Sequence, residues 1–365
     1  MYGDFNEVLP VTKNVKYVLH NSTINGGASP ALNFLVNAVN VEVTGTGRLT
    51  SSAISTVGFN LLGGATNVLI DVLSIENAAN NYAIFEGDVS PTKINIRVRE
   101  KVTAPVLFIG QGDTYYFVDG YATSTNASGN VLTVGKVSGK FTGFINHTYS
   151  TANNATYTIV LGATKNGDPV VMNGNLLENT SPTAATFPAA LFILGQSDST
   201  ADGEIFACFK SIVTDAVDAI QGNLSNNAFA LSAEIICDNI YSAQGRCWNY
   251  QTGQANSKVQ IKADMISDST VTVALQEPGL NILSGRIKCN WNNAGGHAIT
   301  KNIGLASPEL ILDDVTLLTT HAAANCVNTS GAEDVIVYQA QANKAISAGI
   351  TERVGTITVD ATYVK

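Results

Sequence analysis

Charged side chains are scarce in this sequence. They make up 13% of its 365 residues, against about 25% in a typical globular domain. The polar surface must therefore be built from Asn, Thr, Ser and Gly, which suit tight turns and flat sheet faces. The hydrophobic share of 45% is that of a folded protein and excludes a disordered chain.

The chain also lacks clusters of basic residues. Lys and Arg number 20 and Asp and Glu 29, which gives a net charge of −9 and argues against a nucleic-acid partner. No apolar run approaches the ~20 residues of a membrane span. The first residues lack the basic start and apolar core of a signal peptide. We therefore expect no membrane partner and synthesis in a reducing cytoplasm.

Cysteine and histidine form no metal-ligand pattern. The five cysteines are widely spaced without a CxxC pair, and the four histidines do not accompany them. Each cysteine has apolar neighbours, which predicts buried free thiols. We expect no metal site and no cofactor. The cysteines are Cys208, Cys237, Cys247, Cys289 and Cys326.

Motifs of known enzyme chemistry are missing too. The sequence contains neither GxSxG nor a phosphate-binding GxxxxGK[ST] loop. Glycoside hydrolysis needs two carboxylates flanking the scissile bond. The candidates are Asp198 with Asp202 and Glu204, Asp264 with Asp268, Glu333 with Asp334, and the adjacent pair Asp313 and Asp314. Adjacent strand residues point to opposite faces, so this pair can face one substrate only from a turn.

The strongest pattern present is an internal repeat, a short apolar run that ends in glycine. The clear copies are residues 83–87, 106–110, 131–135, 158–162 and 191–195, and weaker copies end at Gly222, Gly253, Gly279, Gly304 and Gly331. These glycines are 23 to 33 residues apart. Such a spread suits a solenoid with fixed strands and turns of varying length.

Between these runs, apolar and polar residues alternate, which indicates strands with one buried face. Each unit of about 25 residues therefore predicts one coil of a right-handed parallel β-helix, because only stacked coils bury their inner faces. A β-sandwich or jelly roll is the alternative, but it lacks the repeated glycine terminator. The residues predicted to point inward are Val68, Ile70, Val72, Ile94, Ile96, Val98, Val259, Ile261, Leu310 and Leu312.

Both ends of the chain differ from the middle. Residues 1–61 alternate without the glycine register and are predicted to form an N-terminal cap or attachment region. The β-helix is predicted over residues 62–347, and residues 348–365 contain a C-terminal strand or cap. A bare strand there needs an edge to pair with, either its own last coil or another subunit.

Exposed aromatic rings beside amide groups are the best sequence signal for glycan binding. Trp291 lies in a polar turn with Asn292 and His297, and these three residues are the candidate glycan site. Trp248 and the pair Tyr115 and Tyr116 are alternative stacking residues.

An Asn-, Thr-, Gly- and Ala-rich solenoid with few charges and a strand-like C-terminus resembles the β-helical tail fibre, tailspike and head-fibre proteins of bacteriophage virions. The resemblance covers most of the chain and is one of architecture and composition. It implies a homotrimer in the virion, made in the host cytoplasm, that is structural or binds a host surface polysaccharide. It also implies that the N-terminal 60 residues contact other virion proteins.

Two other functions remain open from the sequence. One is a polysaccharide-degrading β-helix enzyme, a depolymerase, in which Asp313 and Asp314 would be the catalytic pair. The other is a bacterial surface adhesin.

Overall fold

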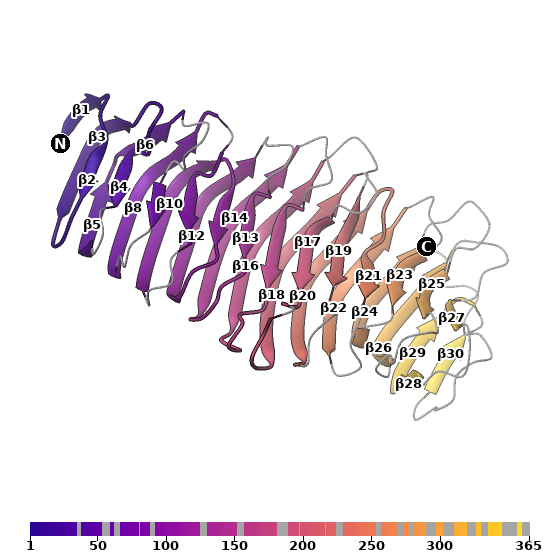
Figure 1. Ribbon diagram of the computed structural model, residues 1–365. Helices are drawn as coiled ribbons and strands as arrows, with labels where there is room; N and C mark the ends of the chain where they lie inside the picture. The colour runs from indigo at the N-terminus through magenta and orange to yellow at the C-terminus, as the bar shows by residue number, and fades with distance from the viewer. Residues whose placement is uncertain are drawn as a thin grey trace.

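The computed structural model is an elongated β-solenoid with β1 and β30 at opposite ends (Figure 1). It describes residues 1–34, 38–52, 59–61, 66–79, 81–87, 92–124, 130–151, 157–180, 189–196, 198–215, 217–223, 229–252, 257–268, 273–277, 280–289, 297–301, 310–319, 326–329, 335–344 and 356–359. All regular elements within these ranges are strands.

Two parallel sheets run along the solenoid. The long-strand sheet has 17 strands and the short-strand sheet has 13. The long-strand sheet contains β1 (Tyr2–Phe5), β3 (Lys16–Asn25), β5 (Val39–Gly45), β6 (Arg48–Ser51), β8 (Thr66–Asn77), β10 (Thr92–Thr103), β12 (Gly112–Ser124), β14 (Phe141–Ser150), β16 (Val170–Asn179), β18 (Gly203–Thr214), β20 (Leu231–Ser242), β22 (Lys258–Ser267), β24 (Leu280–Cys289), β26 (Leu310–Thr319), β28 (Val335–Val337), β29 (Gln339–Ala342) and β30 (Thr356–Val359). The short-strand sheet contains β2 (Leu9–Val11), β4 (Leu32–Phe34), β7 (Phe59–Leu61), β9 (Ile84–Glu86), β11 (Val106–Phe108), β13 (Leu132–Val134), β15 (Ile159–Gly162), β17 (Ala189–Leu194), β19 (Asp218–Asn223), β21 (Trp248–Thr252), β23 (Val273–Glu277), β25 (His297–Lys301) and β27 (Val327–Thr329).

This topology confirms the predicted parallel β-helix. In the middle of the solenoid each coil contributes one long alternating strand and one short strand. The glycine terminators Gly87, Gly110 and Gly135 directly follow β9, β11 and β13 or lie one residue beyond them. The right-handed sense of the coil stays a prediction.

The inner faces of the long strands form the core. Val68 of β8 lies in register with Ile94 of β10, and Ile70 with Ile96. Stacked coils thereby bury apolar ladders that no single coil could bury alone. Nine of the residues predicted to point inward are buried, namely Val68, Ile70, Val72, Ile94, Ile96, Val98, Val259, Ile261 and Leu312; the side chain of Leu310 lies outside the described set.

Many long strands bend near their midpoint, and there two consecutive residues face outward. In β14 these are Asn146 and His147, and in β20 they are Asp238 and Asn239, each pair flanked by buried residues. The bend shifts the in-and-out alternation by one residue, as a β-bulge does. It divides the outer surface of the long-strand sheet into a part before the bend and a part after it.

Small polar residues form a buried ladder where the long strands end. Ser150, Asn179, Thr214 and Ser242 occupy matching register positions in successive strands from β14 to β20. All four are buried, and Ser242 Oγ donates a hydrogen bond to Val217 O at 3.0 Å. The ladder therefore satisfies backbone groups of the corner that leads into the short-strand sheet.

Asparagines form a second ladder on the surface of the first coils. Asn14, Asn40 and Asn67 all adopt left-handed backbone, with φ of 57°, 53° and 52°, which Asn tolerates better than most residues. Asn40 Nδ2 donates to Asn14 Oδ1 at 3.1 Å, and Asn67 Nδ2 donates to Asn40 Oδ1 at 3.0 Å. The Asn-rich composition thus has a structural role in stacking coils.

The two ends of the chain join the same sheets. β3 pairs with β5 and β5 with β8, while β4 pairs with β7. The distinct cap expected for residues 1–61 is therefore not confirmed, because its described strands continue the solenoid. β30 pairs in parallel with β29, so the predicted C-terminal strand has an edge partner within its own chain.

Candidate functional site

The glycan site predicted from the sequence is described only in part. Trp291 and Asn292 lie outside the described residues. His297 is the first residue of β25, is half-buried, and lies in register with Val273 of β23.

Two of the alternative stacking residues belong to the core. Trp248 and Tyr116 have no exposed surface, and Tyr116 packs against Phe108 with ring centroids 5.3 Å apart. Trp248 and Tyr116 were therefore wrong as sugar-stacking candidates, because both point into the solenoid. Tyr115, which precedes Tyr116 in β12, is half-buried on the outer surface.

Asp313 and Asp314 lie at the bend of β26, and both are exposed between the buried Leu312 and Val315. Asp314 adopts left-handed backbone with φ of 54°. This conformation resets the alternation, so both acids face outward although they are adjacent in a strand. The expectation that neighbouring strand residues must face opposite sides was wrong here because of the bend.

The thiol prediction also needs one correction. Cys237, Cys247 and Cys326 are buried free thiols, but Cys208 is half-buried and lies on the outer surface of β18. No group of three or more His, Cys, Asp or Glu side chains suited to a metal ion occurs in the described ranges.

A cluster of aromatic rings lies on the outer surface just after the bend. Tyr121 of β12 is in register with His147 of β14. The ring centroids of Tyr121 and Tyr149 are 5.7 Å apart, and those of His147 and Tyr149 are 5.0 Å apart. All three residues are half-buried. Packing against one another fixes the rings while part of their surface stays open to solvent.

A carboxylate lies beside these rings. Glu178 of β16 is in register with Tyr149, and its Oε2 lies 2.6 Å from His147 Nε2. The side chains of His147 and Glu178 are 34% and 28% exposed. The imidazole thus fixes the carboxylate beside the rings, and Glu178 can accept hydrogen bonds from hydroxyl groups.

A third tyrosine continues the row of side chains that runs through Tyr149 and Glu178. Register pairs link Tyr149, Glu178, Val213 and Tyr241 from β14 to β20. Tyr241 OH donates to Asp268 Oδ2 at 3.0 Å, and burial together with this carboxylate raises the pKa of Tyr241. We call Tyr121, His147, Tyr149, Glu178 and Tyr241 the ring face.

The ring face was missed in the sequence because its members come from different coils. Tyr121 and His147 are 26 residues apart in the chain, and Glu178 follows His147 by 31. A signal was present, since aromatic residues recur at the coil interval, but it becomes visible only when the strands are aligned in register.

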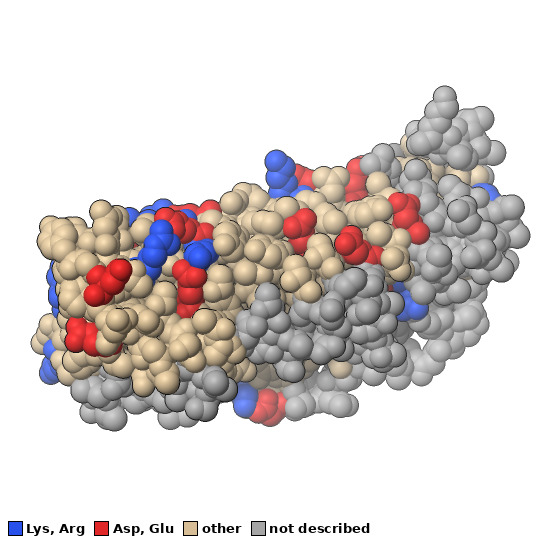
Figure 2. Space-filling model, turned by 90° about the horizontal axis from the view of Figure 1, so that it is seen from above, with Lys and Arg blue, Asp and Glu red and all other residues tan. Residues whose placement is uncertain are grey.

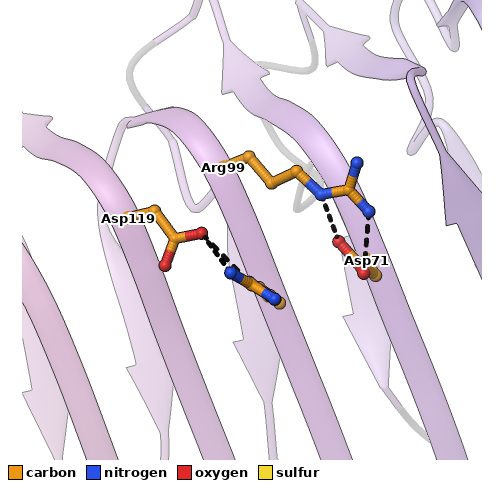
Figure 3. Close-up of polar contacts among 4 residues, drawn as sticks. Asp71, Arg99 and Asp119 are labelled. Carbon is orange, nitrogen blue, oxygen red and sulfur yellow. Dashed lines mark hydrogen bonds and ion pairs between the residues drawn. The ribbon is translucent and has the colours of Figure 1, made fainter.

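Ion pairs join neighbouring coils nearer the N-terminus. Arg99 donates to both carboxylate oxygens of Asp71 at 2.9 Å, and Arg97 Nη2 lies 2.8 Å from Asp119 Oδ2 (Figure 3). Arg48 pairs with Glu100 at 2.6 Å. On the surface drawn in Figure 2, blue and red side chains likewise lie next to one another near this end. Charges paired in this way neutralise one another and create no patch of a single sign.

One further ion pair is enclosed in the solenoid. Lys136 Nζ lies 3.1 Å from Glu86 Oε2 and 3.0 Å from Thr114 Oγ1, and the side chains of Lys136 and Glu86 are 0% and 1% exposed. Burial lowers the pKa of Lys136, although Glu86 opposes this. No ligand can reach these groups without opening the coils, so we assign them a structural role.

Among the described residues, no helix is long and apolar enough to cross a membrane. No family model, curated protein or solved structure matches the chain.

Proposed function

We propose that this protein is a fibre or spike subunit of a virion and that its ring face binds a host surface glycan. The β-solenoid fold is consistent with proteins of the fibre, spike or depolymerase type. The observation that carries the proposal is the cluster of Tyr121, His147 and Tyr149, half-open to solvent and held on a stack of parallel strands.

The chemistry of the ring face suits sugars. Aromatic rings stack on the apolar faces of pyranoses, and a few well-placed polar groups then fix orientation. Glu178 provides such a group beside Tyr149. A parallel sheet also holds these side chains at a fixed spacing of about 4.8 Å between strands, so the site is organised before the ligand arrives.

Removal of one ring tests this proposal. Tyr149→Ala should weaken binding to immobilised polysaccharides of a glycan array about tenfold or more, since a stacked ring contributes roughly 1–3 kcal/mol in comparable sites. Tyr338→Ala is the matched control, because Tyr338 is 53% exposed and follows β28. Lack of wild-type binding to every immobilised glycan, or equal binding by the Tyr149 variant, would contradict the proposal.

The proposed assembly is a homotrimer that contacts other virion proteins through residues 1–61. Half-buried apolar side chains on the outer surface before the bend support subunit contacts: Phe117 lies in register with Phe144, and Val171 with Phe206. Phe144→Asp combined with Phe206→Asp should convert a trimer to a monomer in light scattering while the circular dichroism stays unchanged. A wild-type monomer at micromolar concentration would contradict this assembly.

A second candidate function is polysaccharide cleavage. The outward position of both Asp313 and Asp314 favours it, because paired carboxylates carry out glycoside hydrolysis. Incubation with the glycans that bind, followed by measurement of new reducing ends, tests this alternative. Activity that Asp313→Asn and Asp314→Asn each abolish would establish it, and intact glycan would exclude it for those substrates.

A further inference from the structure

The ring face has an uneven distribution of charge. Its acidic member is Glu178, and Asp268 accepts a hydrogen bond from its third tyrosine, Tyr241. Asp264 of β22 is also half-buried on this surface, in register with Asn239 of β20. Carboxylates therefore flank the rings along several coils.

Basic side chains near the ring face are few. After the bend, the described half-buried or exposed residues of β12, β14, β16, β18, β20 and β22 include neither Lys nor Arg. They are Tyr121, His147, Tyr149, Leu176, Glu178, Ser211, Val213, Asn239, Tyr241, Asp264 and Ile266.

The nearest cations lie beside the ring face and are not members of it. Lys101 of β10 lies in register with Tyr121, but its Nζ is 2.7 Å from Glu76 Oε2, and this contact raises the pKa of Lys101. Lys210 is exposed at the bend of β18, before the ring face begins in that strand.

We infer that the ring face selects polysaccharides without carboxylate, sulfate or phosphate groups. An anionic sugar placed on these rings would meet Glu178 and its neighbouring carboxylates, and the described residues of the ring face include no Lys or Arg to offset the repulsion. Like charges brought together at an interface disfavour binding strongly. Uncharged and amino sugars avoid this repulsion, and the carboxylates accept hydrogen bonds from their hydroxyl or ammonium groups. This inference rests on the proposed function.

The test compares uncharged, amino and acidic polysaccharides on one array at low ionic strength, where repulsion is least screened. The wild type should bind the uncharged or amino class at least tenfold more tightly than any acidic polymer. Glu178→Lys should gain binding to acidic polymers, and this gain should fade as salt is added. Glu204→Lys is the matched control, because Glu204 is exposed on β18 before the bend and its replacement changes the net charge equally.

The outcomes separate the two claims. Tightest wild-type binding to an acidic polymer would overturn the charge selection and leave glycan binding intact. An equal gain in acidic binding from Glu178→Lys and Glu204→Lys would overturn the assignment of selectivity to the ring face. Absence of binding to all classes would overturn the proposed function itself.

Discussion

On the inner side of β8 and β10, apolar residues stack on similar apolar residues, as in Ile70 beside Ile96. On the outer side of the same strands, acidic side chains form ion pairs with basic ones, as Asp71 does with Arg99 (Figure 3). The apolar stacks supply most of the folding free energy, because burial of apolar surface is the dominant favourable contribution. They do not distinguish one coil from another, whereas each ion pair fits one particular neighbour.

The two sides of these strands therefore have different roles. The inner side makes coils stack, and the outer side contributes to the order in which they stack. The buried pair of Lys136 and Glu86 combines both properties, since it is charged and yet fully enclosed. Four predictions test this division, from the largest expected effect on stability to the smallest.

Removal of the buried cation should have the largest effect. Lys136→Met leaves Glu86 buried without its ion pair, and breaking such a pair typically costs about 3–5 kcal/mol. Chemical denaturation of the variant measures the loss. The double variant Lys136→Met with Glu86→Leu should recover much of it, because no buried charge remains. A loss below about 1 kcal/mol in the single variant would show that the pair is not enclosed.

Removal of one hydroxyl from the buried ladder of small polar residues should have an intermediate effect. Ser242 Oγ donates to Val217 O at 3.0 Å and accepts from Gly245 N at 2.9 Å. Ser242→Ala should cost about 1–3 kcal/mol, because the backbone amide of Gly245 loses its acceptor, while Val217 O keeps the hydrogen bond from Thr214 Oγ1. Ser232→Ala is the control on the exposed side of the same strand, and equal melting temperatures of the two variants would refute the distinction.

Breaking an outer ion pair should have a small effect. The side chains of Arg97 and Asp119 are 55% and 39% exposed, and pairs so open to solvent contribute at most about 1 kcal/mol. A double-mutant cycle with Arg97→Gln and Asp119→Asn measures the coupling energy. The coupling should shrink further in about 1 M salt, where charges are screened. A coupling above roughly 2 kcal/mol would contradict the assignment of stability to the inner side.

The cysteines provide a probe that barely affects stability at neutral pH. Cys208 is half-buried on the outer side of β18, and Cys237 lies on the inner side of β20 with 4% of its surface exposed. Burial raises the pKa of Cys237 to about 12, so its thiol stays protonated and unreactive at pH 8. Iodoacetamide should therefore modify Cys208 before Cys237 in the native protein, as mass spectrometry of the peptides would show. Faster modification of Cys237 would contradict the placement of Cys208 on the outer side and Cys237 on the inner side.

The same thiol has a consequence in strong base. The folded pKa of Cys237 lies above its ordinary value of 9.0, so the native state binds the proton more tightly than the unfolded state. The contribution of this thiol to stability is therefore complete below pH 9 and is lost as the pH rises toward about 12.

The sequence was sufficient to predict stacked coils, but not the bend of the long strands or the pairing of the N-terminal strands. Alternation at Val68 to Val72 and at Ile94 to Val98 revealed the stacked strands, because period-two burial depends only on neighbouring residues. The bend was not predictable, because in the sequence a polar pair such as Asp238 and Asn239 looks the same whether it lies at a bend within a strand or in a turn. Residues 1–61 lack the glycine register, and their described strands still join the same sheets, because pairing of strand edges does not require that glycine.

The site was harder to predict for the same reason. Trp248 stood out as a rare aromatic, yet it is buried. Tyr121 and Tyr149 come together across two coils, and such contacts depend on turn lengths that vary along the chain. Local composition therefore identifies the strands but not the side chains that meet on their outer surface.

The most direct test of the central claim is the response of the tyrosine rings to a bound sugar. The protein has 12 tyrosines, which fluorotyrosine labelling would report as separate ¹⁹F signals, assigned by single Tyr→Phe variants. Titration with the tightest-binding uncharged oligosaccharide should shift the signals of Tyr121 and Tyr149 and leave those of Tyr116 and Tyr338 unchanged. Shifts confined to tyrosines outside the ring face would contradict the account.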